Sequence, residues 1–132
     1  MIGCASLDGT DPDRLALPLA FLHHYARAPK PWRTSALPWR YVETNRMPRA
    51  AVCPKAALAL LPPLIKGYLR LGAVVGDGAV IDREFATTDV LIILPVSAIK
   101  SRYLHHFAPR PERDAASGQC GHNQCRFAEP GR

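Results

Sequence analysis

Two basic side chains one helical turn apart are the first feature of this sequence that points to chemistry. Lys66 and Arg70 are four residues apart in a segment that begins after Pro63, so a helix would place both on one face. Two such cations can bind a carboxylate or a phosphate. Gly67 between them lowers helix stability by about 1 kcal/mol relative to alanine, which indicates close packing or the approach of a ligand. The alternative is a solvated helix face.

Acidic side chains flank the turn expected between two apolar strands. Asp82 and Glu84 lie at the end of a strand expected over 79–82, and Asp89 begins another expected over 89–94. Carboxylates at strand ends can bind an ammonium group or act as a general base. The alternative is that they cap the turn and form salt bridges.

Imidazoles and thiols give weaker signals. His23 and His24 are sequence neighbours, as are His105 and His106, and neighbours on a helix point about 100° apart, which does not suit a shared metal ion. Cys4 has no histidine nearby in sequence, which favours a small buried side chain over a nucleophile. The C-terminal tail contains three further potential ligands, Cys120, His122 and Cys125. Their spacing matches no common zinc site, so we expect no metal.

The elements that must position these side chains begin with a strand expected over 2–7. This run is small and apolar, which is typical of a strand covered on both faces inside a parallel or mixed sheet. Thr10 or Asp11 can cap a helix that has Pro12 in its first turn and runs to about Arg27. A strand followed by a capped helix is typical of an α/β fold.

Later elements follow from apolar spacing and from proline and glycine positions. We expect helices over 54–61, 63–73 and 96–107, a turn at 76–78, and the two strands over 79–82 and 89–94. From Pro109 onward there is no apolar periodicity, so residues 108–132 are expected to form a disordered tail. Residues 1–107 are expected to form the folded part.

The chain of 132 residues is 48% hydrophobic and 21% charged, which fits one folded domain and excludes a wholly disordered chain. Its net charge of +6 favours an anionic partner. No apolar stretch reaches the roughly 18 residues that a membrane span needs, and no signal peptide is recognisable. Four cysteines without framework spacing fit a reduced, cytoplasmic protein.

Residues 28–53, here called the basic connection, link the first helix to the second. They are rich in proline and arginine, contain Glu43 as their acid, and interleave Trp32, Trp39 and Tyr41. A short strand is expected over 41–43. Such a segment can bind nucleic acid, dock an acidic carrier protein, or contact an anionic bilayer. The alternative is a solvated loop anchored by its tryptophans. We favour the carrier or lipid surface over nucleic acid.

Five segments together closely resemble the bacterial ornithine N-alpha-acyltransferases, which are hemolysin-like members of the GNAT acyltransferase superfamily. They are MIGCASLDGTDP (1–12), ALPLAFLHH (16–24), ALPWRYVE (36–43), AALALLPPLIKGYLRLGA (56–73) and GDGAVIDREFATTDVLIILP (76–95). The resemblance covers about residues 1–107, in order and with matching spacing. Family members are about twice as long, so the chain resembles their C-terminal half.

The resemblance implies a partial GNAT-type α/β fold. It also implies transfer of a 3-hydroxyacyl group from acyl carrier protein to the α-amino group of ornithine, the first step of ornithine-lipid synthesis. No cofactor other than the acyl-carrier donor is implied. In this layout residues 2–7 are similar to the strand beside the thioester, so the backbone of Gly3, Cys4 and Ala5 would lie along it.

On this resemblance we place chemical roles, leaving the catalytic base unassigned. Lys66 and Arg70 would face an anionic group, either a substrate carboxylate or the carrier phosphate, and Asp82 and Asp89 would hold an ornithine ammonium. The basic connection would face the carrier protein or the inner-membrane leaflet, from the cytoplasm. The alternative is a truncated, inactive fragment that acts as a basic module binding a carrier or a lipid surface.

Overall fold

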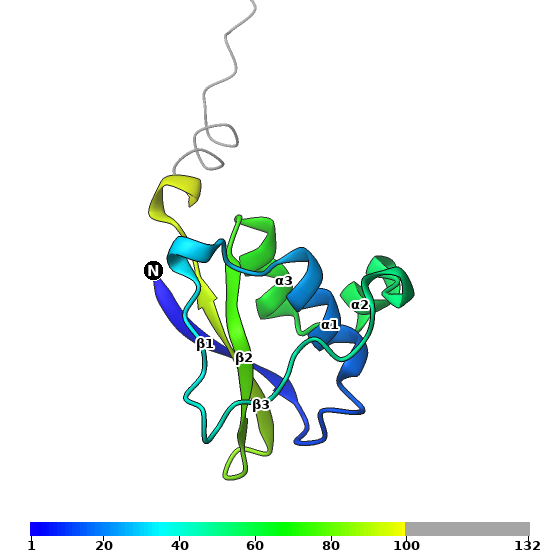
Figure 1. The fold of residues 1–132 in the computed structure, drawn as a ribbon. Coiled ribbons are helices and arrows are strands. Elements are labelled where there is room, and N and C mark those ends of the chain that lie inside the picture. The colour runs from blue at the N-terminus through cyan, green and yellow to red at the C-terminus, as the bar shows by residue number, and fades with distance from the viewer. Residues whose placement is uncertain (100–132) are drawn as a thin grey trace, which may run out of the picture.

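The computed structural model describes residues 1–99, and they form a mixed α/β structure (Figure 1). The strands are β1 (Ile2–Asp8), β2 (Val74–Asp82) and β3 (Thr87–Ile93), and the helices are α1 (Ala16–Tyr25), α2 (Pro54–Leu60) and α3 (Pro63–Arg70). Two 3-10 turns, Lys30–Trp32 and Arg49–Ala51, lie in the basic connection. The strands form an antiparallel sheet in the order β1-β3-β2. The expected α/β class is confirmed at this level.

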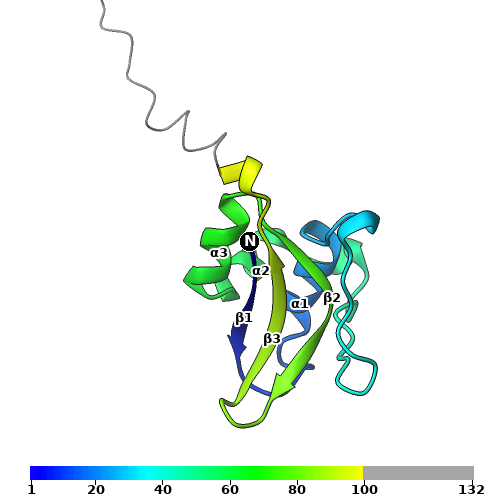
Figure 2. The same cartoon turned by 90° about the vertical axis from the view of Figure 1, so that its left-hand side faces the viewer.

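Strand β1 lies where the sequence predicts it, but its environment differs. It pairs antiparallel with β3 and forms an edge of the described sheet. Only Ala5 and Leu7 in this strand are buried. The helices cover one face of the sheet (Figure 2), so successive side chains alternate between core and surface. The expectation of a strand covered on both faces in a parallel or mixed sheet is therefore wrong within residues 1–99.

Helix α1 begins at Ala16, later than predicted. Neither Thr10 nor Asp11 caps it; Leu15 is the N-cap residue and makes no side-chain capping bond. Asp11 instead accepts a hydrogen bond at Oδ1 from the backbone N–H of Asp13 (3.0 Å), which stabilises a turn before the helix. The Asp11 carbonyl also accepts from the Leu15 N–H (3.2 Å), so a hydrogen-bonded turn over 11–15 precedes the regular helix.

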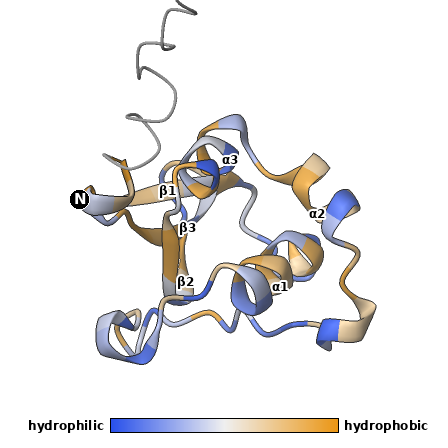
Figure 3. Cartoon of the chain, turned by 90° about the horizontal axis from the view of Figure 1, so that it is seen from above, coloured by the Kyte–Doolittle hydropathy of each residue, from blue (hydrophilic) through white to orange (hydrophobic). Residues whose placement is uncertain are grey.

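The core lies between the sheet and the helices, and Figure 3 shows this layer from above. Its largest fully buried side chains are mostly aliphatic and come from β1, α1, the α2–α3 region, β3 and the residue after β3: Leu7, Pro18, Leu19, Leu22, Leu61, Ile65, Thr88, Val90 and Leu94. The predicted helices over 54–61 and 63–73 are confirmed as α2 and α3, although α3 ends at Arg70. Residues 96–99 are helical. The rest of the helix predicted over 96–107, the tail, and Cys120, His122 and Cys125 lie outside the described residues.

The predicted turn at 76–78 is wrong, because these residues lie inside β2, at an irregularity between Val75 and Ala79. Gly76 and Gly78 allow the basic connection to lie close against β2. A Cβ on Gly76 would lie 2.9 Å from the carbonyl oxygen of Thr34. Gly78 has a φ of +77°, and a Cβ there would overlap the ring of Tyr41.

The basic connection and the end of α1 pair with the outer edge of β2. Three bridges join Arg27 with Val75, Ser35 with Asp77, and Val42 with Ala79. The Asp77 N–H donates to the Thr34 carbonyl (2.7 Å), and the Asp77 carbonyl accepts from the Ala36 N–H (2.9 Å). The strand predicted over 41–43 is thus reduced to one bridge. This pairing fixes residues 34–42 against the sheet and covers its β2 edge.

Replacing Gly78 with alanine tests this contact. We expect Gly78→Ala to lower the free energy of unfolding by at least about 1–2 kcal/mol, since an L-residue resists a positive φ, and because the new methyl group must displace Tyr41. Gly67→Ala is the control, because a Cβ there meets nothing within 4 Å and alanine favours a helix. Urea unfolding measures both. Equal stability of Gly78→Ala and the wild type would contradict the close approach.

Candidate functional site

A cavity of about 520 Å³ lies on the helix side of the sheet and is here called the cationic cavity. Arg27, Lys66 and Arg70 line it together with aromatic and aliphatic side chains from α1, α2 and α3: Phe21, Tyr25, Leu58 and Leu69. The size and the mainly apolar wall with a few charged groups are typical of small-molecule sites. This cavity can therefore accept a ligand that has both an anionic and an apolar part.

Helix α3 places Lys66 and Arg70 on one face, as their spacing predicts. Lys66 is half-buried and Arg70 is exposed, and both line the cationic cavity. The close packing inferred at Gly67 is absent from the described part of the chain, since an added Cβ there would meet open space. The pair therefore borders a hollow rather than only bulk solvent.

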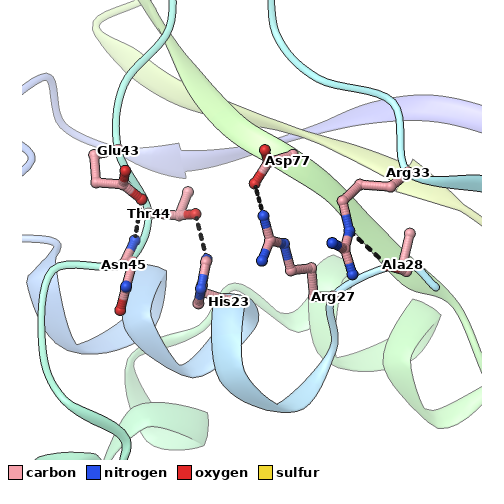
Figure 4. Close-up of polar contacts among 8 residues, drawn as sticks. All are labelled: His23, Arg27, Ala28, Arg33, Glu43, Thr44, Asn45 and Asp77. Atoms are coloured by element: carbon pink, nitrogen blue, oxygen red, sulfur yellow. Dashed lines mark hydrogen bonds and ion pairs between the residues drawn. The ribbon is translucent and has the colours of Figure 1, made fainter. Parts of the chain in front are cut away.

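Arg27 is a third cationic residue of this cavity. Its place in the sequence indicates only the approximate end of the first helix, so it was not predicted as a site residue. Its Nη2 donates to Oδ1 of Asp77 at 2.6 Å, across 50 positions of sequence (Figure 4). Its Nε is buried and has no hydrogen-bond partner among residues 1–99. A buried donor left unpaired costs about 1–3 kcal/mol. Because this nitrogen is buried, a ligand in the cavity does not reach it in this conformation.

A second cavity of about 400 Å³ lies between the sheet and residues 34–40 and is here called the acidic cavity. Asp77, Asp82, Asp89, Arg40 and Cys4 are among its lining residues. Asp89 alternates with the buried residues of β3, so it projects from the sheet face that points away from the helices. The predicted acids Asp82 and Asp89 are thus brought together, and Arg40 and Asp77 are additions that their sequence positions did not reveal.

The two predicted acids are also engaged locally. Oδ1 of Asp82 accepts hydrogen bonds from the backbone N–H groups of Glu84 (2.9 Å) and Phe85 (3.1 Å), which is the turn-capping alternative. Oδ1 of Asp89 accepts from the Thr87 hydroxyl (2.9 Å). Within residues 1–99 these bonds leave Oδ2 of each carboxylate available. A capping role and a ligand-binding role are therefore compatible.

The backbone of β1 borders the acidic cavity at Cys4. Met1 and Leu94 exchange two hydrogen bonds of 2.9 and 2.8 Å, which sets the alternation of the β1–β3 ladder. Gly3 and Ala5 consequently direct their backbone N–H and C=O groups to β3, and Cys4 directs its own groups to the open edge. Of the three residues predicted to lie along a thioester, only Cys4 has backbone groups that face away from β3.

The predicted cations and acids line different cavities. The cationic cavity is built from the helices and the start of β2, whereas Asp82 and Asp89 lie at the sheet face turned away from them. The two cavities share no lining residue. The structure therefore brings Lys66 to Arg70 and Asp82 to Asp89, but it does not bring the two pairs together around one small molecule.

The two histidines of α1 hold the basic connection against the helix. His23 Nδ1 and Thr44 Oγ1 are 3.2 Å apart (Figure 4), and His24 Nε2 lies 2.8 Å from the Met47 carbonyl oxygen. Burial, assisted by the charges of Arg27 and His24, lowers the pKa of His23 below 6.5, against the opposing charges of Glu43 and Asp77. Within residues 1–99 no group of three or more His, Cys, Asp or Glu side chains could hold a metal ion.

None of the described helices has the length and apolar character needed to cross a bilayer.

Comparison with curated proteins relates the chain to acyltransferases. It is 55% identical over 107 residues to an L-ornithine N(alpha)-acyltransferase of Rhizobium meliloti (strain 1021). It is 53% identical over 113 residues to a protein of the same name in Brucella abortus (strain 2308). The chain is thus a homologue of one part of L-ornithine N(alpha)-acyltransferases, which confirms the family resemblance.

These matches cover 81% and 86% of this chain but only 36% and 40% of the two relatives. The chain therefore spans well under half the length of the curated relatives it matches, which is consistent with the expected correspondence to their C-terminal half. No family model and no solved structure matches the chain. The GNAT-type layout accordingly stays an expectation.

The lowered pKa of His23 predicts a pH dependence of stability. The folded state binds a proton at His23 less readily than the unfolded state does, so its contribution is complete above pH 6.5 and declines as pH falls below that value. We expect the melting temperature to fall between pH 7.5 and 5.5, and His23→Gln to flatten this dependence. Differential scanning fluorimetry measures both proteins. Parallel pH profiles would show that His23 does not contribute.

Proposed function

We propose that this chain is the part of an L-ornithine N-alpha-acyltransferase that binds ornithine beside the acyl thioester. The whole enzyme would transfer a 3-hydroxyacyl group from acyl carrier protein to the α-amino group of ornithine, as the first step of ornithine-lipid synthesis. The names of the relatives support the ornithine N-acyltransferase activity. The observation that carries the proposal is the acidic cavity, because it lies against β1 at Cys4.

The lining of the acidic cavity suits ornithine, which carries two ammonium groups and one carboxylate. Asp82 and Asp89 supply negative charge for an ammonium group, and Arg40 supplies positive charge for the carboxylate. Asp77 is already paired with Arg27, so it contributes less to binding an amine. Recognition of both ends would orient the α-amine toward the Cys4 edge.

The proposed reaction is direct transfer. The neutral α-amine attacks the thioester carbonyl carbon, forming the C–N bond and a tetrahedral oxyanion that backbone N–H groups can stabilise. The C–S bond then breaks, the carrier thiolate leaves and takes a proton, and the nitrogen loses a proton to a base or to water. Cys4 contributes its outward N–H to the edge along which the donor would lie. The acyl-carrier donor is the only co-reactant proposed.

Lys66 and Arg70 are proposed to bind an anionic group of a substrate, either a carboxylate or the phosphate of the carrier's prosthetic group. Their separation from Asp82 and Asp89 argues against one ornithine molecule contacting all four side chains. The ornithine carboxylate is therefore assigned to Arg40, and the anion at Lys66 and Arg70 belongs to another molecule or to another part of the acyl donor.

The basic connection is proposed to dock the acidic carrier protein or the anionic cytoplasmic leaflet of the inner membrane. Trp32, Leu37 and Trp39 are 51%, 54% and 76% exposed, and Arg33 and Arg40 lie among them. Amphipathic aromatic side chains beside cations suit a surface that is anionic and partly apolar. We accordingly propose a cytoplasmic protein at the periphery of the inner membrane.

A second candidate function is an inactive module that binds the same carrier or lipid surface without turnover. It is favoured by the length of the match, because the chain corresponds to only 36–42% of the curated relatives. Acyl transfer measured with and without the remaining part of a relative separates the two candidates.

A chimera provides that test. Residues 1–107 replace the matching segment of the Rhizobium meliloti relative, and transfer of a 3-hydroxyacyl group from acyl carrier protein to labelled ornithine is measured. We expect the chimera to be active, and Asp89→Asn to lower kcat/KM for ornithine about tenfold to a hundredfold, as loss of a charged hydrogen bond of about 1.5–3 kcal/mol predicts.

Glu84→Gln is the matched control, because Glu84 is an exposed acid in the adjacent turn that does not line the acidic cavity. It should leave kcat/KM within about twofold, as expected for an exposed charge. A folded, inactive chimera would favour the binding module. An active chimera in which Asp89→Asn matches Glu84→Gln would remove the acidic cavity from the ornithine site.

A further inference from the structure

We infer that the cationic cavity is a binding site for a single-chain anionic amphiphile, with its head group on Lys66 and Arg70. Its alkyl chain would lie along Phe21 and the leucines of α2 and α3. The inference takes from the proposed function only the choice of one probe, because an N-acyl amino acid has this chemistry. It assigns a ligand class to a cavity that is separate from the proposed ornithine site.

The charge of the cavity lining selects the head group. Three cationic residues line the cavity, Lys66 and Arg70 from α3 and Arg27 from the segment that follows α1, and no acid is among the described lining residues. Asp77 already pairs with Nη2 of Arg27, and the Nε of Arg27 is buried, so the charge offered to a ligand comes mainly from Lys66 and Arg70. A carboxylate or phosphate oxygen would neutralise this helix pair.

The apolar part of the cavity lining favours a ligand with an alkyl chain. Phe21 is buried and stacks on Tyr25 with ring centroids 5.2 Å apart, which gives one rigid side. Leu58 is 39% exposed and lines the cavity from α2, and Leu69 extends the same surface from α3. A small hydrophilic anion would leave this apolar surface in water, whereas an alkyl chain would cover it.

The volume of the cationic cavity is also sufficient for such a ligand. The cavity of about 520 Å³ falls within the roughly 300–1,000 Å³ of pockets that bind small molecules. Each methylene group that enters should strengthen binding about fourfold, equivalent to about 0.8 kcal/mol. A chain-length series therefore separates insertion into the cavity from attraction to surface charge alone.

Isothermal titration calorimetry of the full chain with N-acylglycines of increasing chain length, below their micelle concentrations, tests the inference. We expect affinity to rise with chain length, and dodecyltrimethylammonium to bind at least tenfold more weakly than N-dodecanoylglycine. Dodecyl phosphate, compared with N-dodecanoylglycine, distinguishes a phosphate head group from a carboxylate head group. Tighter binding of the phosphate would indicate a phospholipid-like ligand, and tighter binding of the carboxylate an acyl amino acid; either supports the site.

Variants locate the binding. Lys66→Ala with Arg70→Ala should weaken N-dodecanoylglycine binding at least tenfold, and Leu58→Asn should remove most of the chain-length dependence. Lys55→Ala is the matched control, because Lys55 is an exposed lysine of α2 that does not line the cavity. Circular dichroism verifies that each variant is folded, and Lys66→Gln with Arg70→Gln gives a second, more conservative charge removal.

Three results would overturn the inference: unchanged binding in both charge-removal pairs, equal binding of the cationic amphiphile, or loss of binding on Trp32→Ala with Trp39→Ala instead. The last would place the amphiphile on the basic connection. Because no turnover is measured, an inactive chimera would contradict the proposed function without affecting this site. Failed binding here would remove the amphiphile from Lys66 and Arg70 and would leave the proposed ornithine site at Asp82 and Asp89 unaffected.

Discussion

The backbone pairing of residues 26–42 with the outer edge of β2 is the interaction on which both candidate cavities depend. It holds Arg27, one of the lining residues of the cationic cavity, beside Asp77. It also holds residues 34–40 over the far face of the sheet, where they close one side of the acidic cavity. Gly76 and Gly78 make this approach possible because neither position has room for a side chain.

Local pattern was sufficient to predict much of the fold. The prolines that open α2 and α3, the apolar runs of β1 and β3, and the four-residue spacing of Lys66 and Arg70 each depend on residues that are close in sequence. Asp82 and Asp89 could be paired for the same reason, since one turn separates them. These features required no knowledge of which strand lies beside which.

Contacts between distant parts of the chain determine the features of the fold and of the cavities that the sequence did not predict. Gly76–Asp77–Gly78 has the composition of a turn, and only the approach of Thr34 and Tyr41 explains why it continues a strand. The Arg27–Asp77 pair is invisible without that pairing. The sheet then separates the predicted cations from the predicted acids, although the two groups are only about a dozen residues apart in sequence. Burial on one face of β1 likewise follows from sheet order.

Amide hydrogen exchange, measured by NMR, tests most directly whether the basic connection is a fixed part of the sheet. The N–H groups of Asp77, Ala36 and Val42 donate across this pairing, whereas the Cys4 N–H faces the open edge of β1. We expect the first three to exchange at least a hundredfold more slowly than Cys4, as for amides released only by cooperative opening. Exchange of Ala36 and Val42 as fast as that of Cys4 would contradict the pairing, and with it the placement of both cavities.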